Sequence, residues 1–215
     1  MSAPRFVVLE GVEGSGKSTQ VRLLAAWLAG RGVAHTCTRE PGGTEVGEAI
    51  RRILLAEDGL DVPPETELLL VLAARAAFLR SVVRPALERG EVVVADRFDL
   101  STFAYQGYGR GLDLEQVRLL NDFATRGLRP DLYVVLDLPS GEGARRQARE
   151  GKTLDRIERA GEGFLERVRE GYRELATREG RVRVVNARGT PEEVHARIRD
   201  LLASSFPETF AASGV

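Results

Sequence analysis

Lysine and cysteine are almost absent from this chain of 215 residues. Lys17 and Lys152 are the two lysines among 31 Lys and Arg residues, and Cys37 is the single cysteine. One cysteine excludes an internal disulfide, which suits a reducing compartment. With only His35 and His195 beside it, the chain also lacks the ligands of a structural zinc site.

Long apolar runs and a strong net charge are also missing. No stretch approaches the ~20 apolar residues that a membrane-spanning helix needs, and the first predicted strand begins too early to leave room for a signal peptide. The formal net charge of -1 at pH 7 gives no overall signal for nucleic acid or an anionic membrane. We therefore expect a cytoplasmic protein without a membrane or nucleic-acid partner.

Short apolar runs alternate with helical patterns along the chain. The sequence predicts buried strands at 6–9, 33–38, 92–95, 132–136 and 182–185, and helices near 17–30, 44–56, 65–89, 113–126, 140–150, 158–179 and 191–203. This alternation predicts an α/β fold with a parallel sheet covered by helices on both faces. We expect one domain over residues 1–204 and a frayed tail over 205–215.

The segment after the first predicted strand fits the phosphate-binding pattern G-x-x-x-x-G-K-[ST]. Its glycines allow backbone N–H groups to curve around a phosphate, and the following helix N-terminus adds positive potential. A glycine turn beside a surface lysine is the alternative, but a strand enters this segment and a helical pattern leaves it. The sequence therefore predicts a nucleoside triphosphate site formed by Gly11, Val12, Glu13, Gly14, Ser15, Gly16, Lys17, Ser18 and Thr19.

Within this loop Lys17 is expected to reach the β- and γ-phosphates, and the Ser18 hydroxyl to ligate Mg²⁺. Asp96 ends a later apolar strand, a pattern in which the carboxylate helps to position Mg²⁺ opposite the loop serine. Ligands of parallel sheets bind beyond the carboxyl ends of the strands, so these groups are expected to form one site.

Three arginines near strand ends or on an apolar helix face suggest a second anion. Arg97 follows Asp96 directly, and either a surface salt bridge or an anion explains it. Arg75 stands on an otherwise apolar helix face, where it either reaches back to water or points into a pocket, and we favour the pocket. Arg39 lies with Glu40 in a Pro-Gly turn at the exit of a strand, where it is suited to an anionic ligand.

Residues 145–158 carry five positive and three negative charges. An RNA-binding patch is one interpretation, but no aromatic residues are interleaved with the charges. A mobile arginine-bearing flap over a phosphoryl-transfer site fits better, because arginines stabilise the transferred group and closure excludes water. Residues 151–153 resemble a second phosphate loop, but Arg146 stands where its first glycine should be.

Taken together, residues 10–19, 38–44, 96–107, 109–111 and 154–158 resemble the thymidylate kinases, P-loop nucleoside monophosphate kinases that make dTDP from dTMP and ATP. The resemblance covers roughly residues 5–203. It implies a three-layer P-loop NTPase fold with a five-stranded parallel sheet and a short mobile LID at about 145–157. It also implies a homodimer, a Mg²⁺ requirement and ATP as the phosphoryl donor.

The resemblance assigns roles to single positions. For catalysis these are Lys17, Glu13, Arg97 and Arg149, and Arg146 joins the loop residues that bind ATP. On the acceptor side they are Arg39, Val71, Arg75, Arg97, Ser101, Thr102, Tyr105 and Gln106. Because Gly14 occupies a position that carries arginine in one subgroup, the flap is expected to supply the catalytic arginine, either from Arg149 or with Lys152 sharing its role.

One departure concerns the base. Relatives stack a phenylalanine on thymine where this chain has Val71, so either Phe98 or Phe103 substitutes or dTMP binds more weakly. Three other functions stay open: a GTPase or ATPase switch, an inactive nucleotide-binding module, and a kinase of another nucleoside monophosphate. The switch is disfavoured because the chain lacks a guanine-reading N-K-x-D motif.

Overall fold

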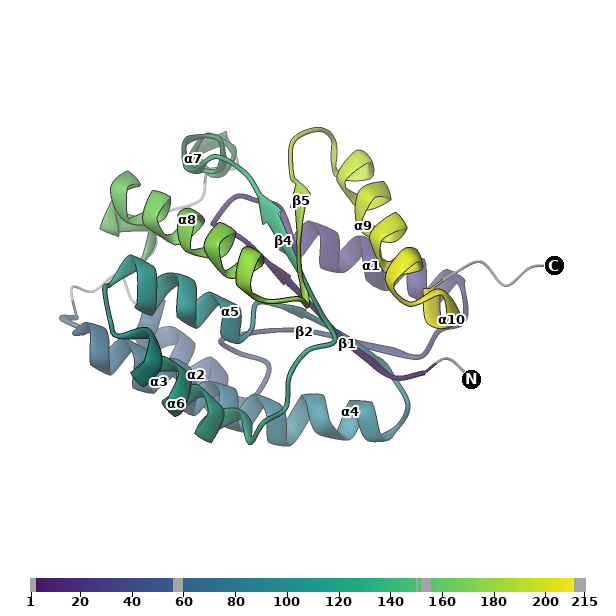
Figure 1. Cartoon of the computed structure of the whole chain (residues 1–215), viewed down its shortest axis with the longest axis horizontal. Helices are drawn as coiled ribbons and strands as arrows, with labels where there is room; N and C mark the ends of the chain where they lie inside the picture. Colours follow the sequence, from purple (N-terminus) through teal and green to yellow (C-terminus); the bar gives the residue numbers. More distant parts are fainter. Residues whose placement is uncertain (1–2, 56–59, 150, 152–155, 211–215) are drawn as a thin grey trace.

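Five parallel strands form the centre of the molecule in the computed structural model, which describes residues 3–55, 60–149, 151 and 156–210 (Figure 1). The strands are β1 (Arg5–Glu10), β2 (His35–Arg39), β3 (Val92–Asp96), β4 (Leu132–Asp137) and β5 (Val182–Asn186). Their order is β2-β3-β1-β4-β5. The predicted five-stranded parallel sheet is therefore confirmed, with β1 in the middle.

The register of the strands explains why the polar clusters meet. In β1, Leu9 pairs with Asp96 of β3, and Glu10 pairs with Val135 of β4. The strand interiors are apolar on both faces, as parallel strands covered by helices require. Polar side chains therefore gather where β1 and β3 end, at one edge of the sheet.

Helices cover both faces of the sheet, as predicted. Helices α1 (Lys17–Gly30) and α9 (Pro191–Ser205) pack on one face against Val7, Leu9 and Val94. The opposite face is covered by α3 (Pro64–Phe78), η1 (Leu79–Val83), α4 (Arg84–Glu88), α5 (Asp99–Thr102), η2 (Phe103–Gly109) and α8 (Glu162–Arg178). Outside this layer, α2 (Glu45–Leu55) and α6 (Leu114–Thr125) pack on α3, and α7 (Ser140–Arg149) lies against α8 (Figure 1).

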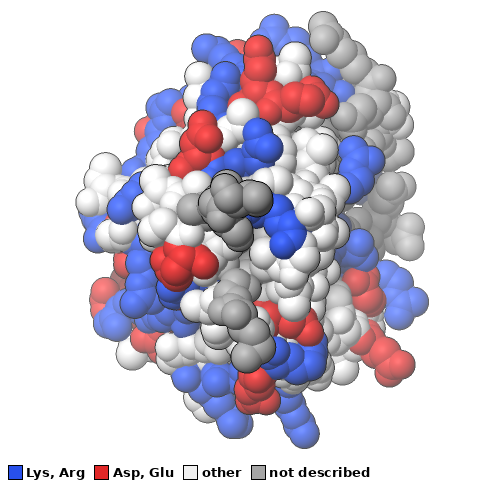
Figure 2. Space-filling view, turned by 90° about the vertical axis from the view of Figure 1, so that its right-hand side faces the viewer, with Lys and Arg blue, Asp and Glu red and all other residues white. Residues whose placement is uncertain are grey.

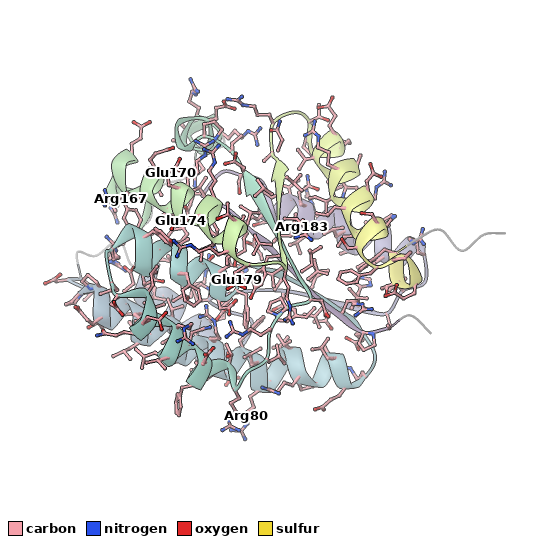
Figure 3. The ribbon with its side chains drawn as sticks, in the orientation of Figure 1. Arg80, Arg167, Glu170, Glu174, Glu179 and Arg183 are labelled. Atoms are coloured by element: carbon pink, nitrogen blue, oxygen red, sulfur yellow. The ribbon has the colours of Figure 1, made fainter. Side chains whose placement is uncertain are left out.

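Helix α8 shows how the sequence pattern places these layers. Its residues Phe164, Val168 and Leu175 are buried at helical spacing. Arg167 and Glu170, which are exposed, project from the side turned away from the sheet (Figure 3). The face seen in Figure 2, on the side of α9 and α10 (Pro207–Phe210), likewise mixes Lys and Arg with Asp and Glu. In the described ranges, the helices fall short of the length and apolar character needed to cross a membrane.

The helix predicted at 65–89 is continuous from α3 through η1 to α4, with a wide turn in its middle. Pro85 explains the irregularity, because proline cannot donate a hydrogen bond and its ring crowds the preceding turn. The helical stretch 99–109, by contrast, was not assigned from the sequence. The second strand also begins at His35 rather than at residue 33.

The prediction of a frayed tail over 205–215 is wrong for residues 205–210. Helix α9 reaches Ser205, and α10 follows it directly. Phe210 is 2% exposed, and its ring stacks on Trp27 with 5.9 Å between ring centroids. The apolar contact with α1 therefore outweighs the loop-forming composition of this segment; the calls for 211–215 lie outside the described residues.

Candidate active site

The loop between β1 and α1 curves around its own lysine. Lys17 is 8% exposed, and its Nζ donates hydrogen bonds to the carbonyl oxygens of Gly11 at 3.1 Å and Val12 at 2.9 Å. Burial, followed by repulsion from Arg97, lowers the pKa of Lys17 to about 8. The ammonium group is thus held over the loop, where an anionic phosphate would favour its charged form.

Ser18 and Asp96 meet as expected from the sequence. The Ser18 Oγ donates a hydrogen bond of 2.6 Å to Asp96 Oδ2, joining the start of α1 to the end of β3. A hydroxyl and a carboxylate are oxygen donors of the kind that Mg²⁺ accepts when substrate phosphates and water complete its shell. These two residues therefore fit a Mg²⁺ ion shared with a triphosphate.

Arg97 lies between the phosphate loop and a neighbouring pocket. Its guanidinium forms an ion pair of 2.7 Å with Glu13 and donates to the Gly11 carbonyl at 3.0 Å and the Tyr105 hydroxyl at 3.0 Å. Tyr105 in turn donates to Glu13 at 2.6 Å. Burial opposes the charge on Glu13, but Arg97 and Lys17 outweigh it and hold its pKa below the usual range.

The backbone of Arg97 is itself unusual. Its φ of 74° lies in the left-handed region, where a side chain other than glycine is strained. The Arg97 N–H donates to the Leu9 carbonyl at 2.9 Å, which continues the β1–β3 pairing one residue past β3. Such strain turns the side chain out of the strand direction, toward the loop.

Glu10, a fully buried carboxylate, organises the segment that follows Arg97. It accepts hydrogen bonds from the backbone N–H groups of Phe98 at 2.9 Å and Ser101 at 3.2 Å, and from the Tyr172 hydroxyl at 2.9 Å. Burial raises the pKa of Glu10, and the nearby Arg97 offsets part of that rise. The sequence analysis did not assign Glu10 a role, although its place at the end of a buried strand marked it as unusual.

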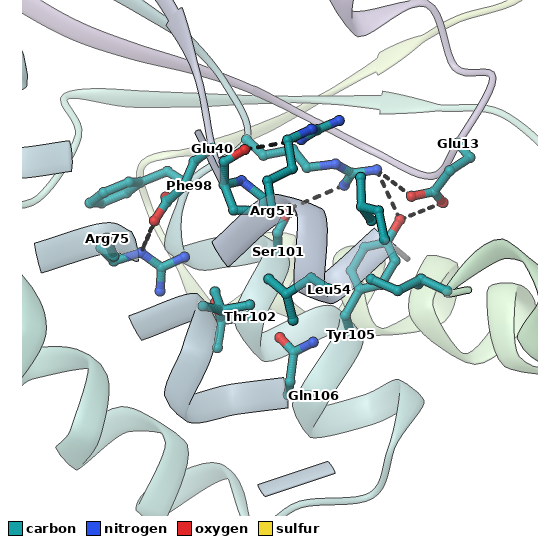
Figure 4. Close-up of a pocket in the computed structure, with 15 residues that line it drawn as sticks. Glu13, Glu40, Arg51, Leu54, Arg75, Phe98, Ser101, Thr102, Tyr105 and Gln106 are labelled. Carbon is teal, nitrogen blue, oxygen red and sulfur yellow. Dashed lines mark hydrogen bonds and ion pairs between the residues drawn. The ribbon is translucent and has the colours of Figure 1, made fainter. Parts of the chain in front are cut away.

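The neighbouring pocket opens beside Arg97 (Figure 4). In this view Arg75 and Phe98 lie toward one end, and Glu13 toward the other. Most of the predicted acceptor residues line it, namely Val71, Arg75, Arg97, Ser101, Thr102, Tyr105 and Gln106. The structure therefore brings these side chains together as the sequence predicted, although it contains no acceptor.

Arg75 is the most deeply buried cation described, with 1% of its surface exposed. Its Nε lies 3.0 Å from Glu40 Oε1, and its guanidinium carbon lies 5.1 Å from the centre of the Phe98 ring. Burial raises the pKa of Glu40 to about 7 although Arg75 lowers it. Arg75 thus points into a pocket rather than back to water, as we favoured from the sequence.

Sequence reasoning missed three contributors to this pocket. Arg51 and Leu54 line it from α2, and Ile157 lines it from the far side of the flap segment. Arg51 donates a hydrogen bond of 3.0 Å to the Pro41 carbonyl. The helical spacing of Arg51 and Leu54 was a usable signal, because residues three apart share one helix face.

Two predicted residues lie outside the pocket lining. Arg39 pairs with Glu48 at 3.0 Å, is about half exposed, and lines a separate hollow beside Ser18 and Asp96. Phe103 packs in the core, so of the two proposed substitutes for a thymine-stacking ring only Phe98 lines the pocket.

The flap is described in part. In α7, Arg146 donates a hydrogen bond of 3.1 Å to the Ala187 carbonyl just after β5, near the phosphate loop rather than the pocket. The side chain of Arg149 and the whole of Lys152 lie outside what the structure describes. The choice between these two as the catalytic flap residue therefore stays a prediction.

Gly14 packs directly against α7. Its φ is +71°, and a Cβ there would lie 2.3 Å from the carbonyl oxygen of Gly143. A Cβ on Gly143 would likewise lie 2.3 Å from the carbonyl oxygen of Glu13. Because real Cβ atoms do not approach so closely, a side chain at position 14 excludes this position of α7. The close contact of these glycines places the first turn of α7 on the phosphate loop.

A phosphate-binding loop after the central strand of a parallel sheet, with a lysine, a serine–aspartate pair and an adjoining arginine-lined pocket, defines a P-loop nucleotide kinase. A sequence profile described as Thymidylate kinase matches residues 9–198. The thymidylate kinase of Desulforudis audaxviator is 49% identical, with 92% of this chain and 91% of that protein covered. That of Alkalilimnicola ehrlichii is 45% identical, with 95% of each covered.

A solved structure agrees with these sequence matches. The crystal structure of thymidylate kinase from Ehrlichia chaffeensis has a TM-score of 0.74 and 30% identity, covering 93% of this chain and 99% of that one. The chain belongs to the thymidylate kinase family.

The Gly14–Gly143 contact predicts that Gly143→Ala displaces α7 from the phosphate loop. We expect kcat/KM for ATP to fall by about 10- to 100-fold, because small misplacements of a site are costly. Gly141→Ala is the matched control, since its Cβ would meet only Glu162 Oε1 at 3.4 Å. Equal activity of the two variants in steady-state assays would contradict the contact.

The lowered pKa of Lys17 predicts a pH-dependent affinity for ATP. Bound phosphate would raise this pKa above its free value of about 8, so binding takes up a proton once the pH exceeds 8. The affinity should be constant below pH 8 and fall by up to about tenfold for each further pH unit. Isothermal titration from pH 7 to 9.5 measures it.

In that titration Lys17→Arg is the control, because a guanidinium does not titrate in this range. A wild-type affinity that stays constant up to pH 9.5 would show that Lys17 remains fully charged without a ligand.

Proposed function

We propose that the protein transfers the γ-phosphoryl group of ATP to dTMP, giving dTDP and ADP. One observation carries this proposal: Arg97 contacts Gly11 and Glu13 of the phosphate loop and also lines the pocket that contains Arg75. Two anion sites therefore share one arginine, as a transfer between two phosphates needs. Membership of the thymidylate kinase family supports dTMP as the acceptor.

On the donor side, the loop backbone and Lys17 would bind the ATP phosphates. Ser18 and Asp96 would hold Mg²⁺, which when bound supplies positive charge to the β- and γ-phosphates. Their hydrogen bond of 2.6 Å already places both oxygens at one point beside the loop. Arg146 remains our choice for a further ATP contact, because it lies between α7 and the end of β5.

On the acceptor side, Arg75 would bind the dTMP phosphate and hold it in line with the γ-phosphate. Thr102 and Gln106 are buried polar residues in the pocket lining, suited to hydrogen bonds with the base. Within the described structure the Thr102 Oγ1 is buried without a hydrogen-bond partner, as expected of an atom reserved for a ligand. Val71 and Phe98 would supply apolar contact to the thymine ring.

The chemistry needs positioning and charge more than proton transfer. The acceptor phosphate is already an anion at neutral pH, so no strong general base is required. Arg97 would exchange its pairing with Glu13 for contact with the two phosphates, stabilising the charge that spreads between them. A flap arginine, for which we propose Arg149, would add to this, since Gly14 provides no side chain.

We also propose a homodimer in the cytoplasm. The outer surfaces of α3 and α6 expose Leu69 (56%), Leu120 (40%) and Phe123 (85%), and these two helices pack on each other. Exposed apolar groups on adjoining helices are typical of an interface between subunits. Nucleotide substrates and the lack of disulfide-forming cysteines suit a cytoplasmic location.

The proposed reaction is tested by incubating the protein with ATP, Mg²⁺ and dTMP, dUMP, CMP, AMP or GMP in turn, following release of ADP. We expect turnover to be fastest with dTMP. Faster turnover with another acceptor would indicate a different monophosphate kinase, and ADP release without an acceptor would indicate an ATPase. No turnover with any acceptor would indicate a binding module.

In the same assay, Arg97→Ala should lower kcat for dTMP by about 10²- to 10³-fold and leave the KM for ATP little changed, because the bridging charge matters most in the transition state. Arg39→Ala is the matched control: this arginine ends the neighbouring strand β2 but pairs with Glu48 outside the pocket. An unchanged kcat in Arg97→Ala would rule out the bridging role.

The proposed dimer predicts that Phe123→Glu produces monomers, because the charge would be buried without a partner in the interface. Val184→Glu is the control, since Val184 is an exposed apolar residue on β5. Sedimentation velocity at micromolar concentration distinguishes the two states. If Phe123→Glu sediments like the wild type, this face is not the interface.

A further inference from the structure

The guanidinium of Arg75 is held from behind by a chain of buried polar side chains. Its Nη1 donates a hydrogen bond of 2.8 Å to Asn121 Oδ1, from the inner face of α6. The Asn121 Nδ2 donates in turn to Asp99 Oδ2 at 3.0 Å, at the start of α5. The other Asp99 oxygen accepts a hydrogen bond from the Tyr133 hydroxyl on β4.

Every member of this chain is buried. Asn121 is 0% exposed, Asp99 1% and Tyr133 6%. Unpaired polar groups at such depth are costly, so each one depends on its neighbours for hydrogen bonds. The chain also fixes the Asn121 amide, whose oxygen must face the cation and whose nitrogen must face the carboxylate. Four elements far apart in the sequence therefore converge on one arginine.

The arrangement separates two needs of the acceptor site. A buried guanidinium must be stabilised, but a carboxylate directly on every edge would compete with a ligand phosphate for it. Asn121 is a neutral acceptor, so it orients Arg75 without neutralising it. Asp99 supplies its negative charge one side chain further away, through the amide of Asn121.

We infer that Asn121, held by Asp99 and Tyr133, is a positioning residue that aims Arg75 at the phosphate of the acceptor nucleotide. This inference rests on the proposed function, because it takes Arg75 as the ligand of that phosphate. Asn121 acts only through Arg75, so its effect is confined to the phosphate group. The nucleoside part of the acceptor is bound by other residues of the pocket.

This confinement gives the test. The affinities of the wild-type chain for dTMP and for thymidine, which lacks the phosphate, are measured by titration calorimetry and repeated with Asn121→Leu. Leucine has a similar shape but cannot accept the hydrogen bond. We expect the Kd for dTMP to rise about tenfold while the Kd for thymidine stays unchanged, because one hydrogen bond to a charged group is lost.

Thr125→Val is the matched control. Thr125 is also fully buried on α6, one turn beyond Asn121, and its hydroxyl bonds to the Asp122 carbonyl at 3.4 Å rather than to Arg75. It should leave the affinity for both ligands unchanged. A general loosening of α6 would instead weaken dTMP and thymidine together in Asn121→Leu, and that result would overturn the inference.

Tyr133→Phe keeps the test decisive if Asn121→Leu does not fold. It removes only the hydroxyl at the far end of the chain, and we expect a smaller loss for dTMP, again without a change for thymidine. An unchanged ratio of the two affinities in this folded variant would overturn the inference while the proposed function stands. A wild-type chain that binds dTMP no better than thymidine would overturn both.

Discussion

Arg97 carries a buried positive charge that must be paired on every edge, and the site is built around that requirement. Glu13 neutralises it from the phosphate loop, the Gly11 carbonyl accepts from it, and Tyr105 joins it from η2. The strained backbone at φ 74° is the conformation that turns this side chain toward the loop. Because the arginine contacts the loop and lines the pocket, the donor and acceptor sites cannot be arranged independently.

Glu10 extends the same constraint into the fold. It is the last residue of the central strand, and it binds the backbone N–H groups of Phe98 and Ser101 at the start of the segment that lines the pocket. The Tyr172 hydroxyl reaches it from α8, the helix that follows the flap. A buried carboxylate therefore ties the sheet, the pocket wall and the flap side of the molecule together. Its cost in desolvation is offset by these donors and by Arg97 nearby.

The sequence predicted those features that depend on local patterns. The strands and most helices follow from apolar periodicity, and Lys17, Ser18 and Asp96 follow from motifs at strand ends. The helical stretch 99–109 was missed because its mix of polar, aromatic and glycine residues shows no clear period. The ordered end of the chain was missed because the packing of Phe210 on Trp27 is a tertiary contact. Arg51 and Asn121 could not be assigned with confidence, since their partners come from distant elements.

Position 14 shows how the structure sharpened one sequence inference. From the sequence, glycine there meant only that the loop lacks an arginine. In the structure, the same glycine leaves room for Gly143, so the bare loop and the placement of α7 are one feature. An arginine at this position would need a different placement of α7.

The central claim is that Arg97 connects the two phosphates of the reaction. A crystal structure with dTMP and a non-hydrolysable ATP analogue bound tests it most directly. The account predicts that the Arg97 guanidinium leaves Glu13 and lies within hydrogen-bond distance of both the γ-phosphate and the dTMP phosphate. An Arg97 that stays paired with Glu13 and contacts neither phosphate would contradict it.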